Sequence, residues 1–512
     1  MFREALAPLA AHRRREGLTA VVSTEPAERA LAALPRRPAC IVLVGDEQAA
    51  RDGSATKRAA SAKEDPPWRV PSPRKPFYRW METQRRTFAA DAAFGDLDGD
   101  GVPDVPVGRL PVRTADELRL VIDKIIRYER RPVGADDLRL PIWSGSAMYG
   151  EVLDRLAAGL LVSTLDRKAP PWVQPWVMIA EPSHPLAGVL AEQPGAMLDQ
   201  VRRGGLMTLL IGHADRTSFQ AALAPGLAKG RPTTIELTAE RAARELAGGQ
   251  AASPMVILAC STGDFAGEGP CLAEALLLAR GGPVAVIAAT TESHPLPNAY
   301  TGRAMLEQFS QGYRRLGSWL LAAQRQAATM RDVVLELALL DVEGKLDERL
   351  DVARLQRDQL LLYAILGDPA TRIRLPQPMD LAVEPAGRGW RWRATPPSTE
   401  AKVIDVSLRP LESTVPVDSP ALRSPAASAP GPASAPAIAP ASGPTSLPGA
   451  ERLRDLHRQA NAGWTFHPLP LPAGAAAWQG EVDREGVLRV LAAEGEKLYV
   501  GTARLERPKA SP

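Results

Sequence analysis

The sequence predicts an α/β protein with a mainly parallel sheet, followed by a smaller β-rich region. Short, continuous apolar runs alternate with amphipathic helical patterns through about residue 375, whereas the segments after Pro376 are short and alternate in polarity. Continuous apolarity suits a strand covered by helices on both faces, and alternation suits an antiparallel strand with one face in water. We therefore expect the two parts to fold differently.

Apolar runs mark the predicted strands of the parallel sheet. They are Cys40–Val44, Trp176–Ala180, Leu206–Ile211, Met255–Ala259 and Val284–Ala289. Helices are predicted over Thr114–Glu129, Ser318–Ala328 and Met330–Leu340. The first of these opens with a capping box, in which Thr114 and Glu117 can satisfy each other's free backbone donors, and its apolar residues then repeat along one face.

The segments after Pro376 predict antiparallel β structure interrupted by a linker. Alternating stretches begin at Trp390, Lys402, Gly486 and Lys497. Residues 416–450 are dominated by Pro, Ala, Ser and Gly, a composition that cannot bury enough apolar surface to offset the entropy of ordering. The pieces on the two sides of this linker form either one sandwich or two separate units.

Charge and cysteine content exclude several classes of protein. The chain has 512 residues with 62 Lys+Arg against 59 Asp+Glu, and its arginines are scattered, so nucleic acid is not the expected partner. Three cysteines exclude a disulfide framework. We find neither an apolar run long enough to span a membrane nor the apolar core of a signal peptide. The expected location is cytoplasmic as the sequence stands, or exported by a route not visible in it, and the oligomeric state is not indicated.

Reactive side chains follow three of the predicted strands. The run Leu206–Ile211 leads into Gly212 and His213, and Met255–Ala259 leads into Cys260. The run Val284–Ala289 leads into a polar stretch that includes His294. Ligands of open parallel sheets bind beyond the carboxyl ends of the strands, so these residues are expected at one edge.

A histidine and a cysteine at such an edge predict a nucleophilic dyad. An imidazole can take the proton of a thiol, and the thiolate then attacks a carbonyl. His213 and Cys260 are 260 − 213 = 47 residues apart, about the length of a strand, a crossover and the next strand. Backbone N–H groups of Cys260 and of Gly212 or Ala214 would hold the oxyanion. The alternative is that His213 merely ends a strand and Cys260 is a core thiol.

A second motif predicts a calcium site. Residues 96–104 read DLDGDGVPD, with Asp96, Asp98 and Asp100 at the first, third and fifth positions of an EF-hand-type loop. The carbonyl of Val102 and the carboxylate of Asp104 would complete the ligands, although no Glu stands at the twelfth position. Without a metal these carboxylates would repel one another; an Asp/Gly-rich surface turn is the alternative.

Taken in order, several short motifs resemble the gingipain-type cysteine peptidases of family C25, which belong to the wider caspase-like group. The motifs are DAAFGDLDGDG at 91–101, VGRLP at 107–111, GH at 212–213, CSTGDF at 260–265, CLAEA at 271–275 and LGDP at 366–369. The resemblance extends to about Leu375. It implies a caspase-like α/β/α sandwich preceded by a smaller α/β subdomain and often followed by an immunoglobulin-like β-domain. It also implies that His213 is the catalytic histidine and Cys260 the nucleophile, and calcium-binding loops are familiar in this family.

The resemblance also marks departures around the site. Ala214 stands where family members commonly have Gly. An acidic residue of the specificity pocket would lie in the segment 145–154, where Glu151 and Asp154 are the candidates, and one of them is alternatively a residue that orients His213. His294 falls where the family places pocket residues, and it is either a substrate contact or a plain loop histidine.

These expectations define a domain plan and a function. Residues 1–135 are the N-terminal subdomain, 136–376 the catalytic subdomain, and 377–415 and 451–512 the β-rich segments around linker 416–450. The predicted function is a calcium-stabilised cysteine endopeptidase that acts on polypeptides through a thioester acyl-enzyme. The alternative is a catalytically silent scaffold of the same fold that binds a partner protein.

Overall fold

The computed structural model describes most of the chain, including the predicted strands and the candidate dyad. The described residues are 1–47, 66–78, 86–146, 151–224, 233–333, 335–336, 351–411, 449–471 and 478–507. Linker 416–450 therefore lies almost wholly outside them. Within the described residues, the structure contains no helix with the length and apolar character needed to span a bilayer.

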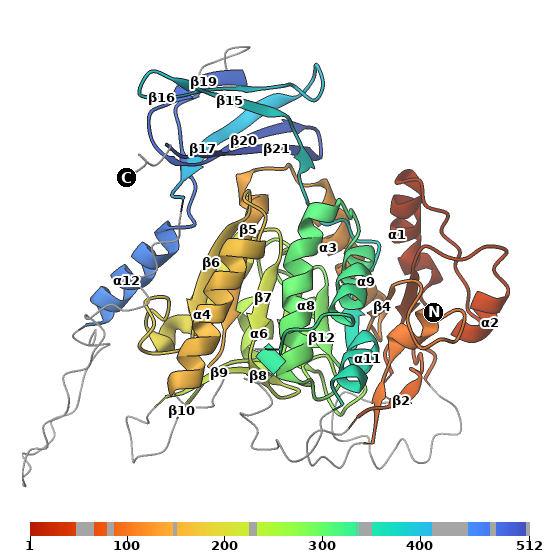
Figure 1. Ribbon diagram of the computed structural model, residues 1–512. Coiled ribbons are helices and arrows are strands. Elements are labelled where there is room, and N and C mark those ends of the chain that lie inside the picture. The colour runs from red at the N-terminus through yellow and green to blue at the C-terminus, as the bar shows by residue number, and fades with distance from the viewer. Residues whose placement is uncertain are drawn as a thin grey trace, which may run out of the picture.

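An eight-stranded sheet forms the centre of the molecule (Figure 1). In spatial order it contains β1 (Ile41–Val44), β4 (Val107–Leu110), β13 (Tyr363–Leu366), β12 (Val286–Ala289), β11 (Met255–Leu258), β7 (Thr208–Ile211), β5 (Arg139–Ser144) and β6 (Gln174–Ile179). Every neighbouring pair in this sheet is parallel except β12 and β13. The prediction of a mainly parallel sheet is confirmed. Strands from residues 1–135 and from 136–376 belong to this one sheet.

The central strands are buried on both faces, as their continuous apolarity predicts. In β11, Met255 and Ile257 belong to the core cluster on one face, and Val256 and Leu258 to the cluster on the other. Successive side chains of a strand point to opposite faces, so a strand between two helical layers must be apolar throughout. This burial gives the α/β/α sandwich.

Helices cover the two faces of the sheet (Figure 1). The first face packs against α3 (Ala115–Arg130), α5 (Gln193–Arg203), α6 (Ala239–Glu245) and α7 (Leu272–Leu278). The second packs against α4 (Glu151–Lys168), α8 (Pro295–Gln308), α9 (Leu316–Ala327) and α11 (Val352–Leu362). Short helical segments complete the layers: α2 (Ala27–Ala32), η2 (Asp91–Gly95), η3 (Ala135–Leu138), η4 (Leu190–Glu192) and η5 (Phe309–Gln311).

The predicted helices mostly agree with the structure. The capping box of Thr114 and Glu117 is present at the start of α3. The prediction over Ser318–Ala328 corresponds to α9, which begins two residues earlier. Of the helix predicted over Met330–Leu340, the structure describes residues 330–333 and 335–336, and helical turns appear only from 333; the other positions lie outside the described residues.

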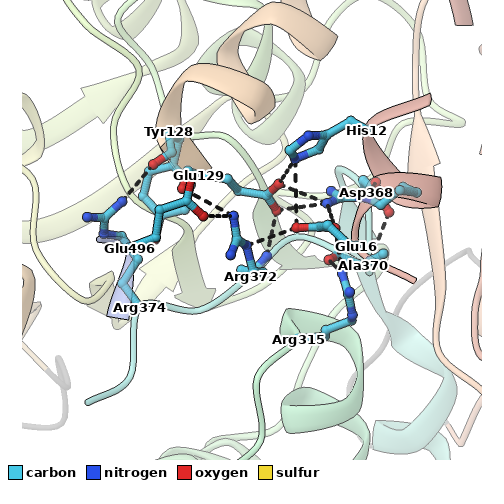
Figure 2. Close-up of polar contacts among 11 residues, drawn as sticks. His12, Glu16, Tyr128, Glu129, Arg315, Asp368, Ala370, Arg372, Arg374 and Glu496 are labelled. Atoms are coloured by element: carbon cyan, nitrogen blue, oxygen red, sulfur yellow. Dashed lines mark hydrogen bonds and ion pairs between the residues drawn. The ribbon is translucent and has the colours of Figure 1, made fainter. Parts of the chain in front are cut away.

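A buried charge cluster holds the N-terminal helix α1 (Arg3–Arg15) against the body of the protein (Figure 2). The carboxylate of Glu129 lies 2.5 Å from His12 Nε2 and accepts hydrogen bonds from Arg13 at 2.8 and 3.0 Å. Arg13 Nε also donates to Asp368 at 2.8 Å, and the backbone N–H of Arg372 donates to Glu129 at 2.7 Å. Buried charges are tolerated when each one is paired and hydrogen-bonded, which is the case in this cluster.

The β-rich segments on the two sides of the linker form one unit. One sheet has the order β14 (Gln377–Pro378), β21 (Lys497–Leu505), β20 (Gly486–Glu494), β17 (Lys402–Arg409) and β18 (His467–Pro468). The second contains β15 (Leu381–Ala386), β16 (Gly389–Ala394) and β19 (Gln479–Val482). Both sheets combine strands from before and after residues 416–450, which decides between the two alternatives in favour of a single domain.

This C-terminal domain lies at the end of the large sheet opposite to β8 and β9 (Figure 1). Arg489 in β20 donates to the carbonyl of Trp172, which precedes β6, at 3.3 Å. The domain therefore contacts the chain just before β6, at the amino end of that strand. It lies at the end of the sheet away from β8 and β9 (Figure 1).

Helix α12 (Ala450–Ala462) leaves the C-terminal domain and covers the edge strand β6 (Figure 1). The side-chain amide of Asn461 accepts from the N–H of Val177 at 2.7 Å and donates to the carbonyl of the same residue at 3.0 Å. Further along β6, the N–H of Ile179 donates to Leu186 O, and Pro175 has no N–H to offer. An exposed strand edge invites pairing with other chains, and these contacts close it.

Candidate active site

The register of the sheet places His213 and Cys260 at equivalent positions on neighbouring strands. Ile211 at the end of β7 pairs with Leu258 at the end of β11, and each reactive residue stands two positions further along its chain. The N–H of Gly212 donates to Leu258 O at 3.2 Å, which is the last contact of this ladder. Both His213 and Cys260 are partly buried. This pairing brings the chain segments of the two residues side by side, and the dyad itself stays a prediction.

His213 belongs to a small antiparallel sheet that the sequence patterns did not reveal. It comprises β8 (His213–Ala214), β9 (Ser218–Ala224) and β10 (Thr233–Thr238). Asp215 closes the turn after β8, because its carboxylate accepts from the N–H groups of Thr217 and Ser218 at 2.7 Å each. These bonds help to hold the pKa of Asp215 below its usual value, against the effect of its burial. The backbone around His213 is thus fixed by a local hairpin.

Cys260 is held by the segment that follows β12. Its sulfur lies 3.4 Å from the backbone N of Ser293 and 3.5 Å from the carbonyl O of the same residue. Burial raises the pKa of the Cys260 thiol and outweighs the hydrogen bond from Ser293, which acts in the other direction. The neighbouring carboxylate of Glu292 raises it further. Both effects favour the protonated thiol over the thiolate.

A buried hydrogen-bond chain continues behind Ser293. Asn298 Nδ2 donates to Ser293 Oγ at 2.9 Å, and Asn298 Oδ1 accepts from Tyr363 and Gln359 at 2.8 and 2.9 Å. These side chains are almost fully buried. The sequence patterns did not reveal Asn298, Gln359 and Tyr363 as a group, because they come from α8, α11 and β13. The one local signal was that Asn298, in the first turn of α8, follows Ser293 by five residues.

The loop after Cys260 is shaped by buried contacts that explain several of its motif residues. A Cβ at position 263 would lie 2.7 Å from Ala288 O, so only glycine fits there. The Phe265 ring packs under the guanidinium of Arg109, 4.6 Å from its centroid. Arg109 is itself fully buried and forms a bidentate pair with Asp91. The VGRLP and CSTGDF motifs therefore meet in one packed unit.

The other two cysteines have structural surroundings. Cys271 is fully buried at the start of α7, and its N–H donates to Glu274 at 2.9 Å. Burial raises the pKa of the Cys271 thiol well above its ordinary value. Burial likewise raises the pKa of Cys40, to about 12. Both thiols stay protonated near neutral pH.

The backbone N–H groups of Gly212 and Ala214, the two alternative oxyanion donors, differ in their hydrogen bonding. The prediction for Gly212 is wrong, because its N–H is committed to Leu258 O in the sheet. The N–H of Asp215 donates to Ser218 O, so the next pair along this antiparallel ladder, Ala214 with Phe219, is a non-hydrogen-bonded pair. The N–H of Ala214 therefore points away from β9 and can serve another acceptor.

The pocket candidates come from the segments that follow β5 and β12. The side chain of Glu151 lies outside the described residues. Asp154 accepts a hydrogen bond from Ser146 Oγ at 2.5 Å, and Ser146 follows β5 in the same register in which His213 follows β7. His294 is 2% exposed and accepts the N–H of Leu296 as the N-cap of α8. It also lines a small pocket with Glu292, Asp358 and aromatic side chains of residues 77 and 78.

The aspartate-rich loop brings carboxylates together near η2. Single oxygens of Asp96, Asp98 and Asp104 lie within 4.8 Å of one another. Asp100 instead accepts the N–H of Val102 at 2.8 Å, and Asp104 pairs with Arg37 at 2.7 Å. The donor set is made of hard oxygen ligands, which suits a calcium ion.

The chain is similar to one sequence family and to several solved structures. The sequence matches peptidase family C25 over residues 1–374. The solved structures of the Arg specific cysteine proteinase gingipain R and of a complex of the Porphyromonas gingivalis RgpB pro- and mature domains each share 13% identity with the chain, at a TM-score of 0.44. Each match covers 93% of this chain; it covers 86% of the gingipain R chain and 88% of the RgpB chain.

A further solved structure, described as a protease, has 12% identity and a TM-score of 0.50, and the match covers 98% of this chain and 95% of that one. This last likeness concerns the fold. No curated protein sequence matches the chain. The family match includes every strand of the eight-stranded sheet, and therefore also β7 and β11, which precede His213 and Cys260. The chain therefore belongs to peptidase family C25, and it is a cysteine-type endopeptidase whose substrates are polypeptides.

Proposed function

We propose that this endopeptidase cleaves peptide bonds with Cys260 as the nucleophile and His213 as the acid and base. The observation that carries the proposal is their equivalent placement after two paired, parallel strands. Cys271 and Cys40 lack such a placement, since neither stands beyond the end of β11 or β7. The raised pKa of the Cys260 thiol also calls for a neighbouring base.

The reaction proceeds in two halves. In the first, the imidazole takes the thiol proton, Sγ attacks the carbonyl carbon, and the tetrahedral intermediate collapses when the imidazolium gives the proton to the leaving amine. In the second, the imidazole takes a proton from water, hydroxide attacks the thioester, and the sulfur leaves and regains the proton. The N–H groups of Ala214 and Cys260 are the proposed donors to the oxyanion. Asp154 is the proposed orienting group for His213, since its partner Ser146 lies next to His213 in the register.

Alkylation by iodoacetamide tests the nucleophile. We expect selective modification of Cys260, at a rate that falls when His213→Ala is made, while Cys40 and Cys271 react slowly. Cys260→Ala should abolish cleavage of labelled casein. Equal, slow alkylation of all three cysteines, together with full casein cleavage by Cys260→Ala, would contradict the dyad. Equal alkylation with no cleavage by the unaltered protein would favour the silent scaffold.

We also propose that calcium binds the loop of Asp96, Asp98 and Asp104 and stabilises the fold. Three carboxylate oxygens within 4.8 Å of one another support this, because their mutual repulsion is relieved by a divalent cation. Asp100 and the carbonyl of Val102 are the further proposed ligands. Arg37 neutralises part of the charge of Asp104 and would compete with the ion.

Thermal melting with and without calcium tests this site. We expect calcium to raise Tm, by the linkage between ligand binding and stability, and Asp98→Ala to remove that response. Asp123→Ala is the matched control, because Asp123 is an exposed aspartate paired with Arg127 on α3. An unchanged Tm in calcium, or an equal response of Asp98→Ala and the unaltered protein, would remove the proposal.

A further inference from the structure

One arginine joins the segment of His213 to the segment of Cys260. Arg216 stands in the turn between β8 and β9, and its side chain is 16% exposed. Its guanidinium donates to four backbone carbonyls of the loop between β11 and α7. The acceptors are Asp264 O at 2.9 Å, Gly267 O at 3.0 Å, Glu268 O and Gly269 O. The carbonyl of Arg216 in turn accepts the N–H of Leu272 at 2.9 Å.

These contacts need a guanidinium. Four carbonyl oxygens directed at one place carry partial negative charges that repel one another unless a cation lies between them. Arginine offers five N–H groups in a planar fork, whereas lysine offers three around a single point. The chain makes room for the fork, because a Cβ at Gly267 would lie 2.4 Å from Arg216 Nε. The conformation of the loop therefore depends on Arg216.

The location of these contacts matters for the dyad. The ladder between β7 and β11 ends with the bond from Gly212 N to Leu258 O, so His213 and Cys260 both stand beyond it. Arg216 joins the two chain segments again on the far side of the reactive residues. The imidazole and the thiol lie between two points at which their segments are tied together.

We propose that Arg216 is a positioning residue for peptide cleavage, which fixes the thiol of Cys260 relative to the imidazole of His213. The proposal rests on the roles given above to those two residues. Arg216 does not touch the sulfur or the substrate in this proposal; it acts through the loop and the hairpin. A displacement of about 1 Å at a reacting pair can cost about 100-fold in rate, so the loss of these contacts should be visible in catalysis.

Arg216→Ala and Arg216→Lys test the proposal, with labelled casein as substrate and iodoacetamide as the probe of Cys260. For Arg216→Ala we expect kcat to fall by roughly 100-fold with a smaller change in KM, and Arg216→Lys to recover part of the loss. The pH profile of Cys260 alkylation should move to that of His213→Ala. In the double variant Arg216→Ala/His213→Ala, Cys260 should be alkylated no more slowly than in His213→Ala alone. Both changes remove the same coupling between the imidazole and the thiol.

Two further variants keep the outcome interpretable. Arg202→Ala is the matched control, because Arg202 also donates to a backbone carbonyl, that of Glu245, but away from the loop; its kcat and alkylation profile should stay unchanged. If Arg216→Ala does not fold, Gly267→Ala displaces the guanidinium instead and should shift the alkylation profile in the same direction.

A lower Tm with an unaltered alkylation profile, or additive effects in the double variant, would overturn the proposal and leave Arg216 a structural role. That result differs from failure of the proposed nucleophile. In the latter case Cys260→Ala keeps its activity, whereas a failure of the positioning role leaves Cys260→Ala inactive and Arg216→Ala as reactive as the unaltered protein.

Discussion

The candidate active site and the charge cluster around Glu129 are both buried polar regions, and they are built in opposite ways. Glu129 is bonded by His12, Arg13 and the backbone of Arg372, and these partners overcome the effect of burial and hold its pKa at about 2. Cys260 contacts Ser293 through longer sulfur bonds, and burial raises its pKa. The charged group is fixed in one protonation state, while the neutral one can lose its proton in a reaction. Dense pairing suits a structural charge, and the weaker contacts of Cys260 suit the nucleophile proposed for this site.

The largest expected effect separates the two kinds of buried cysteine. Cys260→Ala should lower kcat/KM by at least about 10⁴-fold and leave Tm nearly unchanged, because the sulfur reacts but supports little packing. Cys271→Ser should do the reverse, since a hydroxyl placed in a fully buried site costs roughly 1–3 kcal/mol of the free energy of unfolding. Casein cleavage and thermal melting measure both. A Cys271→Ser protein that is stable but inactive would break the comparison.

Breaking the charge cluster should affect stability alone. Glu129→Ala removes a buried partner of both His12 and Arg13, and we expect it to cost about 3–5 kcal/mol of the free energy of unfolding. Urea unfolding measures this loss. The activity per folded molecule should stay close to that of the unaltered protein; a loss of kcat in the fully folded variant would contradict the separation of the two regions.

The same carboxylate should produce acid sensitivity. The pKa of Glu129 falls from 4.5 to about 2 on folding. Its contribution to the free energy of unfolding is therefore complete above pH 4.5 and is lost as the pH falls from 4.5 towards 2. The loss is on the order of 3 kcal/mol. Urea unfolding at several pH values should show this slope in the unaltered protein and a shallower one in Glu129→Gln. Equal slopes would show that another group is responsible.

A neutral buried contact away from both regions should have a smaller effect. Asn461→Ala removes the amide that satisfies the N–H and the carbonyl of Val177 on the edge strand β6. The carbonyl keeps its contact with His457 Nε2 at 3.0 Å, but the buried N–H loses its partner, which should cost about 1–3 kcal/mol, measured by urea unfolding. Casein cleavage should be unaffected, since β6 lies two strands away from β7. A loss of activity without a loss of stability would show that α12 acts on the site.

The smallest effect is expected from an exposed ion pair that joins α12 to η4. Arg454 and Glu192 form a surface ion pair in which both side chains are close to half exposed. Arg454→Ala should change the free energy of unfolding by less than about 1 kcal/mol, because solvent screens such pairs. It is therefore the matched control for Asn461→Ala. A larger loss would mean that the pair, rather than the amide, anchors α12.

Much of the framework could be predicted from local patterns. The apolar runs at Met255–Ala259 and Leu206–Ile211 correspond to β11 and β7, and the capping box at Thr114 begins α3. The positions of His213 and Cys260 after those strands followed directly. Each of these signals lies within a few neighbouring residues, where the period of apolar residues and the need to satisfy helix-end donors act.

The sequence alone therefore determined the layered α/β architecture, the β-rich end and the two residues proposed for catalysis, because each of them leaves a local pattern. The tertiary structure decided that Gly212 is committed to the sheet, that Ser293 holds the sulfur of Cys260 and that Arg216 ties the two reactive segments together. It also decided that strands from both sides of the linker share one domain and that α12 closes the edge of β6. These contacts join residues tens to hundreds of positions apart, and such pairings depend on where the whole chain places its elements rather than on any neighbouring sequence.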